Sequence, residues 1–365
     1  MTASPATWTT RPLGEIATLQ RGFDLPTRLR KRGLIPIVSS SGITGTHNES
    51  MVAAPGVVTG QYGTIGEVFY LDTAFWPLNT TLWVSDFHGN DERFTFYLLH
   101  RLDFASHSGK SGVPGVNRND LHQLAVAIPV APREQHRIAA ALADADELIA
   151  LLIRLIAKKD SLKQGVMQQL LTGDTRLPGF TAPWRKVLLG TISQIKTGSC
   201  NNQDKSAFGR YPFFVRSATV EHIDSYSYDC EAILVPGEGG IGSIFHYVSG
   251  KFEVHQRVYK ISHFDADMNG RFIYYYMRQF FGRHAMENSV KATVDSLRLP
   301  TFRGFSLTVP ADMQEQRAVA GVLDDASREI DLLHERLGKA ISVKQGMMQE
   351  LLTGRTRLPA EKAAT

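Results

Sequence analysis

The sequence is poor in cysteine and has no long hydrophobic run. Its two cysteines, Cys200 and Cys230, lie 30 positions apart without any C-x-x-C pair, which argues against a disulfide framework and a zinc knuckle. The most apolar stretch, LIALLIRLIA at 148–157, contains an arginine and is too short to span a bilayer. The first residues, MTASPATW, lack the basic and apolar regions of a signal peptide. We therefore expect a globular protein located in the cytoplasm.

Motifs of several enzyme classes are also missing. The sequence has no H-E-x-x-H, no G-x-S-x-G, no Pro-Pro as amino-group methyltransferases require, and no lysine with an acid two residues before it, as in a P-D…[DE]-x-K nuclease centre. The segment HSGKSG at 107–112 is similar to a P-loop, but Phe104 stands where the first glycine is required. These absences predict a chain that is not an enzyme by itself and that binds no metal.

A glycine-rich stretch raises the question of nucleotide binding. ILVPGEGGIGSIF at 233–245 contains G-x-G-x-x-G, but that fingerprint needs a helix after its third glycine to hold the pyrophosphate. The residues that follow are β-branched and aromatic, which predicts a strand, a turn and a strand. The related stretch VVTGQYGTIGEVF at 57–69 lacks the middle glycine. We interpret the glycines as a turn; a nucleotide-dependent enzyme is the alternative, which binding of NAD or ATP would support.

The strongest pattern is an internal repeat. KQGVMQQLLTGDTRLP at 163–178 recurs as KQGMMQELLTGRTRLP at 344–359, with 13 of 16 positions identical at an offset of 181. Earlier parts of the two halves align at an offset of 176, as WTTRPLGEIATLQRG at 8–22 does with WRKVLLGTISQIKTG at 184–198, and WPLNTT with FEVHQR further on. The change of offset predicts a five-residue insertion between about residues 270 and 300.

Each repeat contains a long stretch with helical periodicity. Apolar residues step by four and three, which is the pattern of a coiled-coil seam. Each helix should run for about 40 residues, roughly 60 Å, and its natural partner is its twin; two unconnected amphipathic helices are the alternative. The predicted seam comprises Ile138, Leu142, Ile149, Leu152, Ile156, Val319, Leu323, Ile330, Leu333 and Leu337, with Ala145 and Ala326 completing the steps.

The ends of these helices carry start and stop signals. Asp312 and Glu315 have the spacing of a capping box, and Gly173 and Gly354 follow the last apolar pair of each helix as C-terminal stops. The remaining segments show short strand-like runs, glycine turns and one helical piece each, which predicts two α+β domains. The expected boundaries are 1–130 for the first domain, 131–173 for the first helix, 174–184 for a linker, 185–311 for the second domain, 312–354 for the second helix and 355–365 for a tail.

These features together resemble the specificity subunit of type I restriction-modification systems. The resemblance covers essentially the whole chain and rests on the repeated L-L-T-G segments, on the Glu-Gln pairs at 134–135 and 315–316, and on the G-x-I-G turns. It implies an α+β fold in which two similar target-recognition domains are separated by two long helices that form an antiparallel coiled coil, with an internal pseudo-two-fold repeat. Each domain would read one half of a bipartite DNA target, and the helices would set the gap.

The resemblance also implies partners. These are two methyltransferase subunits, which bring S-adenosylmethionine, and a restriction and translocase subunit, which uses ATP and Mg; this chain would bind none of these cofactors. Two alternatives stay open: the specificity component of a related bipartite-site methyltransferase or fused type II system, and a coiled-coil adaptor that never binds nucleic acid.

Candidate DNA contacts come from polar and basic residues in loops. The segment 21–32 holds five basic residues against one acid, a density suited to phosphates, although a solvated loop is the alternative. Glu238, at the tip of a glycine turn, is expected to accept from a cytosine N4 amine. For the first domain we predict Arg28, Arg30, Lys31, Ser39, Ser40, Tyr62, Asn79, Thr80, Lys110, Ser111, Asn117 and Arg118. For the second we predict Lys196, Lys205, Arg216, Ser217, Glu238, His255, Gln256, Arg257, Lys291, Thr293 and Arg298.

Overall fold

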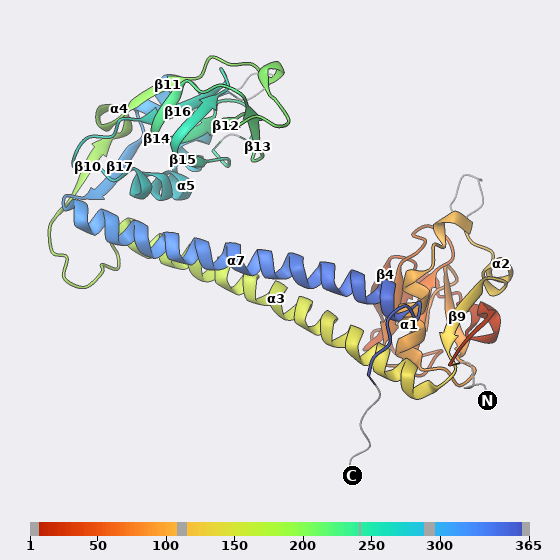
Figure 1. The fold of residues 1–365 in the computed structure, drawn as a ribbon. Coiled ribbons are helices and arrows are strands. Elements are labelled where there is room, and N and C mark those ends of the chain that lie inside the picture. Colours follow the sequence, from red (N-terminus) through yellow and green to blue (C-terminus); the bar gives the residue numbers. More distant parts are fainter. Residues whose placement is uncertain (1–6, 108–114, 241, 288–295, 360–365) are drawn as a thin grey trace, which may run out of the picture. The chain divides into compact units, whose positions relative to one another are not determined.

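The computed structural model describes residues 7–107, 115–240, 242–287 and 296–359. The chain divides into two compact units, one made of residues 1–153 with 335–365 and the other of 154–334. Each unit holds one α+β domain together with part of each of the two long helices α3 (Pro132–Thr172) and α7 (Met313–Leu351) (Figure 1). Within the described residues no helix is long and apolar enough to cross a membrane.

The first domain lies between β1 and β9, which pair antiparallel. Two further sheets have the strand orders β2-β8-β5-β6 and β4-β3-β7. The apolar faces of the larger sheet and of helix α1 form a core with the start of α3. The elements are β1 (Trp8–Pro12), β2 (Thr18–Arg21), β3 (Ile35–Ser39), β4 (Gly42–His47), β5 (Gly56–Gly60), β6 (Val68–Leu71), β7 (Trp76–Pro77), β8 (Thr81–Asp86), α1 (Glu92–Arg101), α2 (Arg118–His122) and β9 (Ala125–Pro129).

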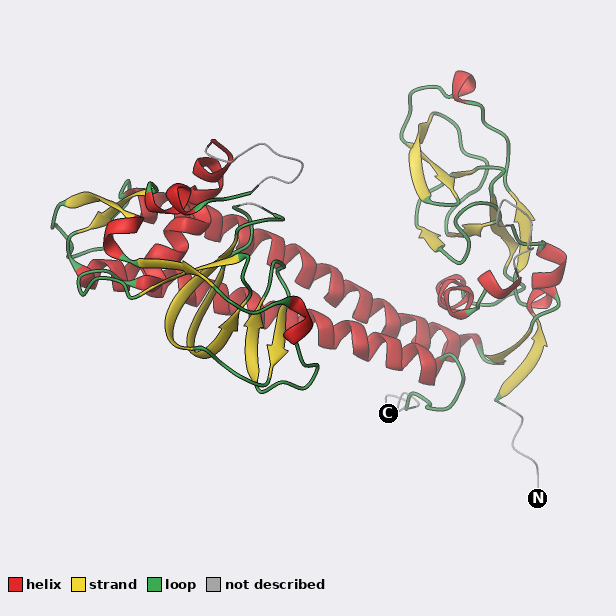
Figure 2. Cartoon of the chain, turned by 90° about the horizontal axis from the view of Figure 1, so that it is seen from above, coloured by secondary structure: helices red, strands yellow, loops and turns green. Residues whose placement is uncertain are grey.

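The second domain repeats this order with one continuous six-stranded sheet, β11-β16-β14-β15-β12-β13. The sheet is continuous because one nine-residue strand, β15, pairs with both β14 and β12, where the first domain uses two short strands, β6 and β7. Figure 2 shows the strands of the second domain side by side in this sheet. The elements are β10 (Trp184–Leu188), α4 (Leu189–Ile192), β11 (Gln194–Thr197), β12 (Tyr211–Phe214), β13 (Val220–Ile223), β14 (Tyr228–Pro236), β15 (His246–Val254), β16 (Val258–Ser262), α5 (Gly270–Glu287), α6 (Leu299–Arg303) and β17 (Ser306–Pro310).

The expected single insertion in the second half is wrong. The N–H of Gln61 donates to the Thr80 carbonyl, and the N–H of Gly237 donates in the same way to the Arg257 carbonyl. Gln61 and Gly237 differ by the offset of 176, but Thr80 and Arg257 differ by 177. The second half has therefore already gained one residue before α5. Thr80 therefore corresponds to Arg257, and the alignment of WPLNTT with FEVHQR is shifted by one residue. The N–H groups of Phe94 and Phe272 donate to Asp91 and Asn269 in the same way, so the offset is 178 where α1 and α5 begin. The extra residues are thus spread over more than one loop, because a loop tolerates added length more easily than a paired strand does.

The predicted long helices are confirmed. Helix α3 has 41 residues and α7 has 39, and both end before glycines with φ of +78° at Gly173 and +70° at Gly354. All ten predicted seam residues are buried or half-buried. In the first unit Lys344 of α7 pairs with Asp146 of α3, and in the second unit Glu329 pairs with Lys159. Within the first unit, Leu351 and Leu352 of the α7 end pack with Ile138 and Leu142, which precede Asp146 on α3. Within the second unit, Val319 and Leu323 precede Glu329 on α7 and pack with Met167 and Leu170, which follow Lys159 on α3. The helices therefore pair antiparallel within each unit.

Each domain core contains the ends of both long helices. The first core joins Ile138 and Leu142 of α3 to Leu351 and Leu352 at the end of α7. The second core joins Val319 and Leu323 of α7 to Met167, Leu170 and Leu171 of α3. Helices packed only on their own domains would not bury these residues, so the alternative of two unconnected helices is wrong.

Two equivalent ion pairs fix these helix ends. The Arg357 guanidinium donates from Nε and Nη2 to the Glu134 carboxylate at 3.0 and 2.6 Å, and Arg176 binds Glu315 in the same way at 2.8 and 2.5 Å. The predicted capping box is therefore only half right: Asp312 accepts from the Gln314 N–H at 2.8 Å, but Glu315 turns to the arginine. A guanidinium offers two charge-assisted bonds, whereas the cap N–H offers one.

The glutamines next to these acids, Gln135 and Gln316, are buried and form hydrogen bonds to their own domains. The amide of Gln135 accepts from the Asp91 N–H and donates to Asn90 and to the Pro129 carbonyl. In the second unit Gln316 accepts from the Asn269 N–H and donates to the Asp267 and Pro310 carbonyls. The Glu-Gln pair thus joins each long helix to a returning arginine on one side and to its own domain on the other.

One histidine of the first domain is a half-buried acceptor. The Nε2 atom of His122 accepts from the Leu19 N–H at 2.8 Å. Burial, with the charge of Arg118 adding to it, lowers the pKa of His122 from its usual 6.5. The side chain is therefore neutral at pH 7.

Candidate nucleic-acid interface

Three chain segments meet at one edge of each domain and form what we call the strand-end platform. In the first domain it comprises the residues at the end of β3 (39–40), after β5 (61–62) and between β7 and β8 (78–80). The N–H groups of Gln61 and Tyr62 donate to the Thr80 carbonyl at 2.9 and 3.1 Å. Ser40 packs against Gly60, where a Cβ would lie only 3.2 Å from the Ser40 Cβ.

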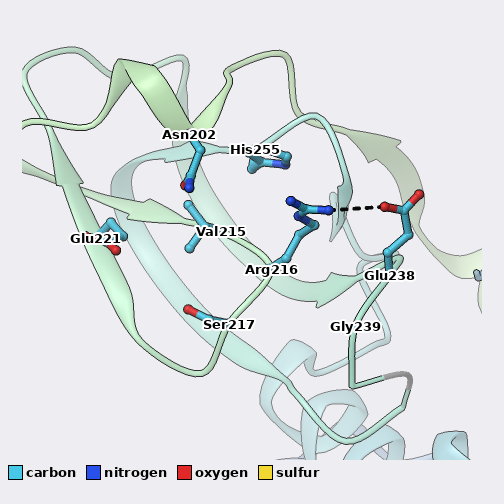
Figure 3. A pocket seen from close by; sticks show the side chains of 8 residues that line it. All are labelled: Asn202, Val215, Arg216, Ser217, Glu221, Glu238, Gly239 and His255. Atoms are coloured by element: carbon cyan, nitrogen blue, oxygen red, sulfur yellow. Dashed lines mark hydrogen bonds and ion pairs between the residues drawn. The ribbon is translucent and has the colours of Figure 1, made fainter. Parts of the chain in front are cut away.

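The second domain builds the same platform from residues 215–217, 237–238 and 255–257. The N–H of Gly237 donates to the Arg257 carbonyl at 2.8 Å, and the N–H of His255 donates to the Phe214 carbonyl at 3.0 Å. These segments surround a cavity of about 470 Å³ (Figure 3). The cavity is lined by Asn202, Val215, Arg216, Ser217, Glu221, Glu238, Gly239 and His255.

The second platform is strongly charged. The Glu238 carboxylate accepts from Arg216 Nη1 at 3.3 Å and from Arg257 Nη1 at 3.0 Å, and Figure 3 shows the Arg216 and Glu238 side chains pointing toward one another. His255 lies beside them and its Nδ1 accepts from the Arg257 N–H at 3.0 Å. Burial, followed by the charges of the two arginines, lowers the pKa of His255. The imidazole is therefore neutral at pH 7, with Nε2 carrying its proton.

The residues of the first platform carry no formal charge, although Arg21 donates to the Asn79 carbonyl at 3.0 Å. Tyr62 stands where the second domain has Glu238, and Thr80 stands where it has Arg257. The Asn79 side chain donates to Asp24. The Ser39 hydroxyl contacts the Ser41 hydroxyl and donates to the Gly42 carbonyl. Gln61, which the sequence reasoning did not single out, is buried, and within the part of the chain that the structure describes its Oε1 has no partner. No pattern in the sequence marks this residue, because it follows an ordinary buried strand.

The structure brings together many of the predicted contacts. Ser39, Ser40, Tyr62, Asn79 and Thr80 lie on the first platform, and Arg216, Ser217, Glu238, His255, Gln256 and Arg257 lie on the second. The segments that hold Asn117 and Arg298 adjoin the platforms, because the Val116 N–H donates to the Gln61 carbonyl and the Leu297 N–H to that of Gly237. Lys205 lies near the cavity through its ion pair with Glu221.

The other predicted residues lie elsewhere or outside the described residues. Arg28 is on a three-residue helix at Thr27–Leu29, Arg30 donates to the Leu25 carbonyl, and the Lys31 N–H donates to His47. These contacts give residues 28–31 local order, whereas the start of the segment reaches the first platform, because Arg21 and Asp24 both contact Asn79. Arg118 begins α2 and Lys196 is exposed on β11. The described residues do not include Lys110, Ser111, Lys291 or Thr293.

The glycine-rich stretch is a turn, as predicted. It connects β14 to β15, and Gly239, Gly240 and Gly242 have φ of +70°, +67° and +66°, values that side chains disfavour. No helix follows among the residues described there, so the pyrophosphate cradle is not formed. The described residues also include no group of three His, Cys, Asp or Glu side chains placed to hold a metal ion, and both cysteines are free.

Two domains of one plan, with long paired helices and differing polar platforms, define a modular recognition protein. The family model described as "Type I restriction modification DNA specificity domain" matches residues 5–158 and again residues 182–341. The chain therefore belongs to this family, as its sequence predicted.

Individual relatives agree with this assignment. The chain is 28% identical over 170 residues to the type I restriction enzyme EcoDI specificity subunit of Escherichia coli, a match that covers 47% of this chain and only 37% of that relative. It is 21% identical over 306 residues to the MjaVIII specificity subunit of Methanocaldococcus jannaschii, which covers 73% of this chain and 71% of that relative.

Solved structures show the same fold. The type I restriction-modification S subunit of M. genitalium superposes with a TM-score of 0.72 at 16% identity, covering 96% of this chain and 97% of that one. A chain from a study of type I system assembly and conformational transition gives a TM-score of 0.56 at 16% identity, covering 96% of this chain and 99% of that one. The predicted fold class, two similar α+β domains with long antiparallel helices, is confirmed.

Proposed function

We propose that this chain is the DNA-reading component of a type I restriction-modification complex, and that each domain reads one half of a bipartite target. Family membership supports the class of function. The observation that carries the proposal is the strand-end platform, which has the same backbone hydrogen bonds in both domains but different side chains. A repeated scaffold with different polar groups is what reading two different half-sites requires.

The chemistry of the platforms suits base edges. Bases in the major groove are distinguished by their pattern of donors and acceptors, whereas phosphate contacts only position the protein. The first platform offers hydroxyl, phenol and amide groups, and the second offers guanidinium, carboxylate and a neutral imidazole. The two half-sites should therefore differ in sequence, and the length of the paired helices should set the number of unread base pairs between them.

Catalysis would belong to partner subunits. We propose two methyltransferase subunits, which carry S-adenosylmethionine, and one restriction and translocase subunit, which uses ATP and Mg, all in the cytoplasm. The sequence supports a non-catalytic role for this chain because it lacks the motifs of those activities. The description of the family as a DNA specificity domain supports recognition in the same way.

Methylome sequencing tests the proposal directly. A host that carries the gene with its partner genes should show one split methylated motif, and deletion of this gene alone should remove that motif. Filter binding of duplex DNA across salt concentrations supplies the second measurement, since the affinity of a DNA reader falls steeply as salt rises. An unchanged methylome together with binding that is absent at low salt would instead favour a protein adaptor.

A further inference from the structure

Glu238 holds two arginines at the centre of the second platform. Its two carboxylate oxygens each accept from one guanidinium, at 3.3 Å from Arg216 and 3.0 Å from Arg257. Both contacts use Nη1, and among the described residues neither guanidinium has another partner. Each arginine therefore keeps donors free while one of its donors binds Glu238.

These ion pairs are too exposed to serve mainly as stabilising contacts. The arginine side chains are 50% and 59% exposed and the glutamate is 24% exposed, and pairs of this kind contribute little to folding. The first domain has the neutral residues Ser40, Tyr62 and Thr80 at the equivalent places and forms the same backbone platform without them. Glu238, Arg216 and Arg257, which we call the charged triad, are thus not needed to build the platform.

The charge of the triad selects the ligand. A phosphate that approached either arginine would also approach the Glu238 carboxylate, and like charges repel. A neutral base edge avoids this repulsion, and guanine presents two acceptors, O6 and N7, that match the paired donors of a guanidinium. The neutral His255 beside the triad adds no positive charge that would favour a phosphate.

We propose that Arg216 and Arg257, held in place by Glu238, read guanines in the half-site of the second domain. Glu238 is then a positioning residue for both arginines. This inference rests on the proposed function, because it assumes that the platform faces the major groove. The direct reading of a cytosine N4 amine by Glu238, expected from the sequence, is the competing outcome.

The test uses the full complex, purified from its host, and selects binding sites from random duplex DNA. Arg216→Lys and Arg257→Lys keep the charge but lose the paired donors. Each should reduce the preference for guanine at one position by roughly 5- to 150-fold, both should affect the same half-site, and the other half-site should be unchanged. Arg185→Lys is the matched control, since Arg185 lies on β10 and pairs with Asp267 outside the platform.

Glu238→Gln separates the two roles of the acid. If Glu238 positions the arginines, the variant should still select guanine, but less strictly, and its affinity should fall more steeply with salt because phosphates now compete for the freed guanidinium groups. If the variant instead loses a cytosine preference while guanine positions stay fixed, Glu238 reads a base itself and the positioning role is overturned.

Failure of the inference is distinguishable from failure of the proposed function. A wild-type complex that selects no split motif contradicts the proposed function. A wild-type complex that selects a split motif which neither lysine variant alters contradicts only the guanine assignment. The unchanged half-site in each selection shows that the variant complex is folded and assembled.

Discussion

The two halves of the chain should be able to replace each other, and a fragment of residues 1–178 tests this. The fragment holds the first domain and all of α3, but it lacks the α7 end that completes the first core. The end of its own α3 carries nearly the same sequence as the missing end of α7. Two copies could therefore exchange these ends, each supplying Leu170, Leu171 and Arg176 to the other, so we expect a homodimer.

The structure gives the magnitude of the loss in a monomer. Leu351 and Leu352 are 4% and 0% exposed in the first core, and burial of a leucine side chain stabilises by about 1.5–3 kcal/mol. Their absence removes about 3–6 kcal/mol, and Glu134 also loses the guanidinium of Arg357. A typical domain is stable by only about 5–15 kcal/mol, so a monomeric fragment should be poorly folded.

Analytical ultracentrifugation with circular dichroism measures the outcome. Leu171→Ala should weaken the dimer by about a thousandfold or more, because each of two symmetric sites loses at least about 2 kcal/mol. Leu162→Ala, at a position that is 54% exposed, is the control and should leave the dimer intact. The double substitution Ile149→Asp and Leu152→Asp should abolish dimer formation, since two charges would be buried in the seam. A fragment that is well folded yet monomeric at tens of micromolar would refute the reasoning.

Three further outcomes are expected. Replacing residues 1–130 by residues 179–310 should give a target of two identical half-sites in inverted orientation, read by methylome sequencing; an unchanged motif would contradict one reader per domain. One heptad added to each long helix, after Leu155 and after Arg336, should extend the pair by roughly 10 Å and widen the unread gap by about three base pairs with both half-sites kept. Because the folded pKa of His122 is lowered, the unfolded state binds its proton more readily. The free energy of unfolding should therefore stay level above pH 6.5 and fall below it, whereas His122→Asn should lack this slope in urea titrations from about pH 5 to pH 7.

The sequence alone determined the long helices, their seam and the repeated plan of the chain. Helical periodicity is local, so the steps from Ile138 to Ile156 predict which face is buried without knowledge of the partner. The glycine turn was predictable for the same reason, since the residues after Gly242 favour strands over a helix. The near-identity of the segments 163–178 and 344–359 revealed the repeat and predicted that each long helix pairs with its twin.

Only the tertiary structure decided which polar groups meet. Glu315 has the sequence spacing of a capping box, yet it binds Arg176, a residue 139 positions away, because the returning helix end brings a guanidinium within reach. The sequence places Glu238 at the tip of a turn and predicts a contact with a base, but it does not reveal the two arginines that Glu238 binds, which lie 22 and 19 positions away. Such pairs depend on strand register and on loop lengths accurate to one residue, as the shifted alignment of Thr80 with Arg257 shows. Periodicity determines which face of an element is buried, whereas the contacts between polar side chains are set by the packing of distant segments, which no local pattern records.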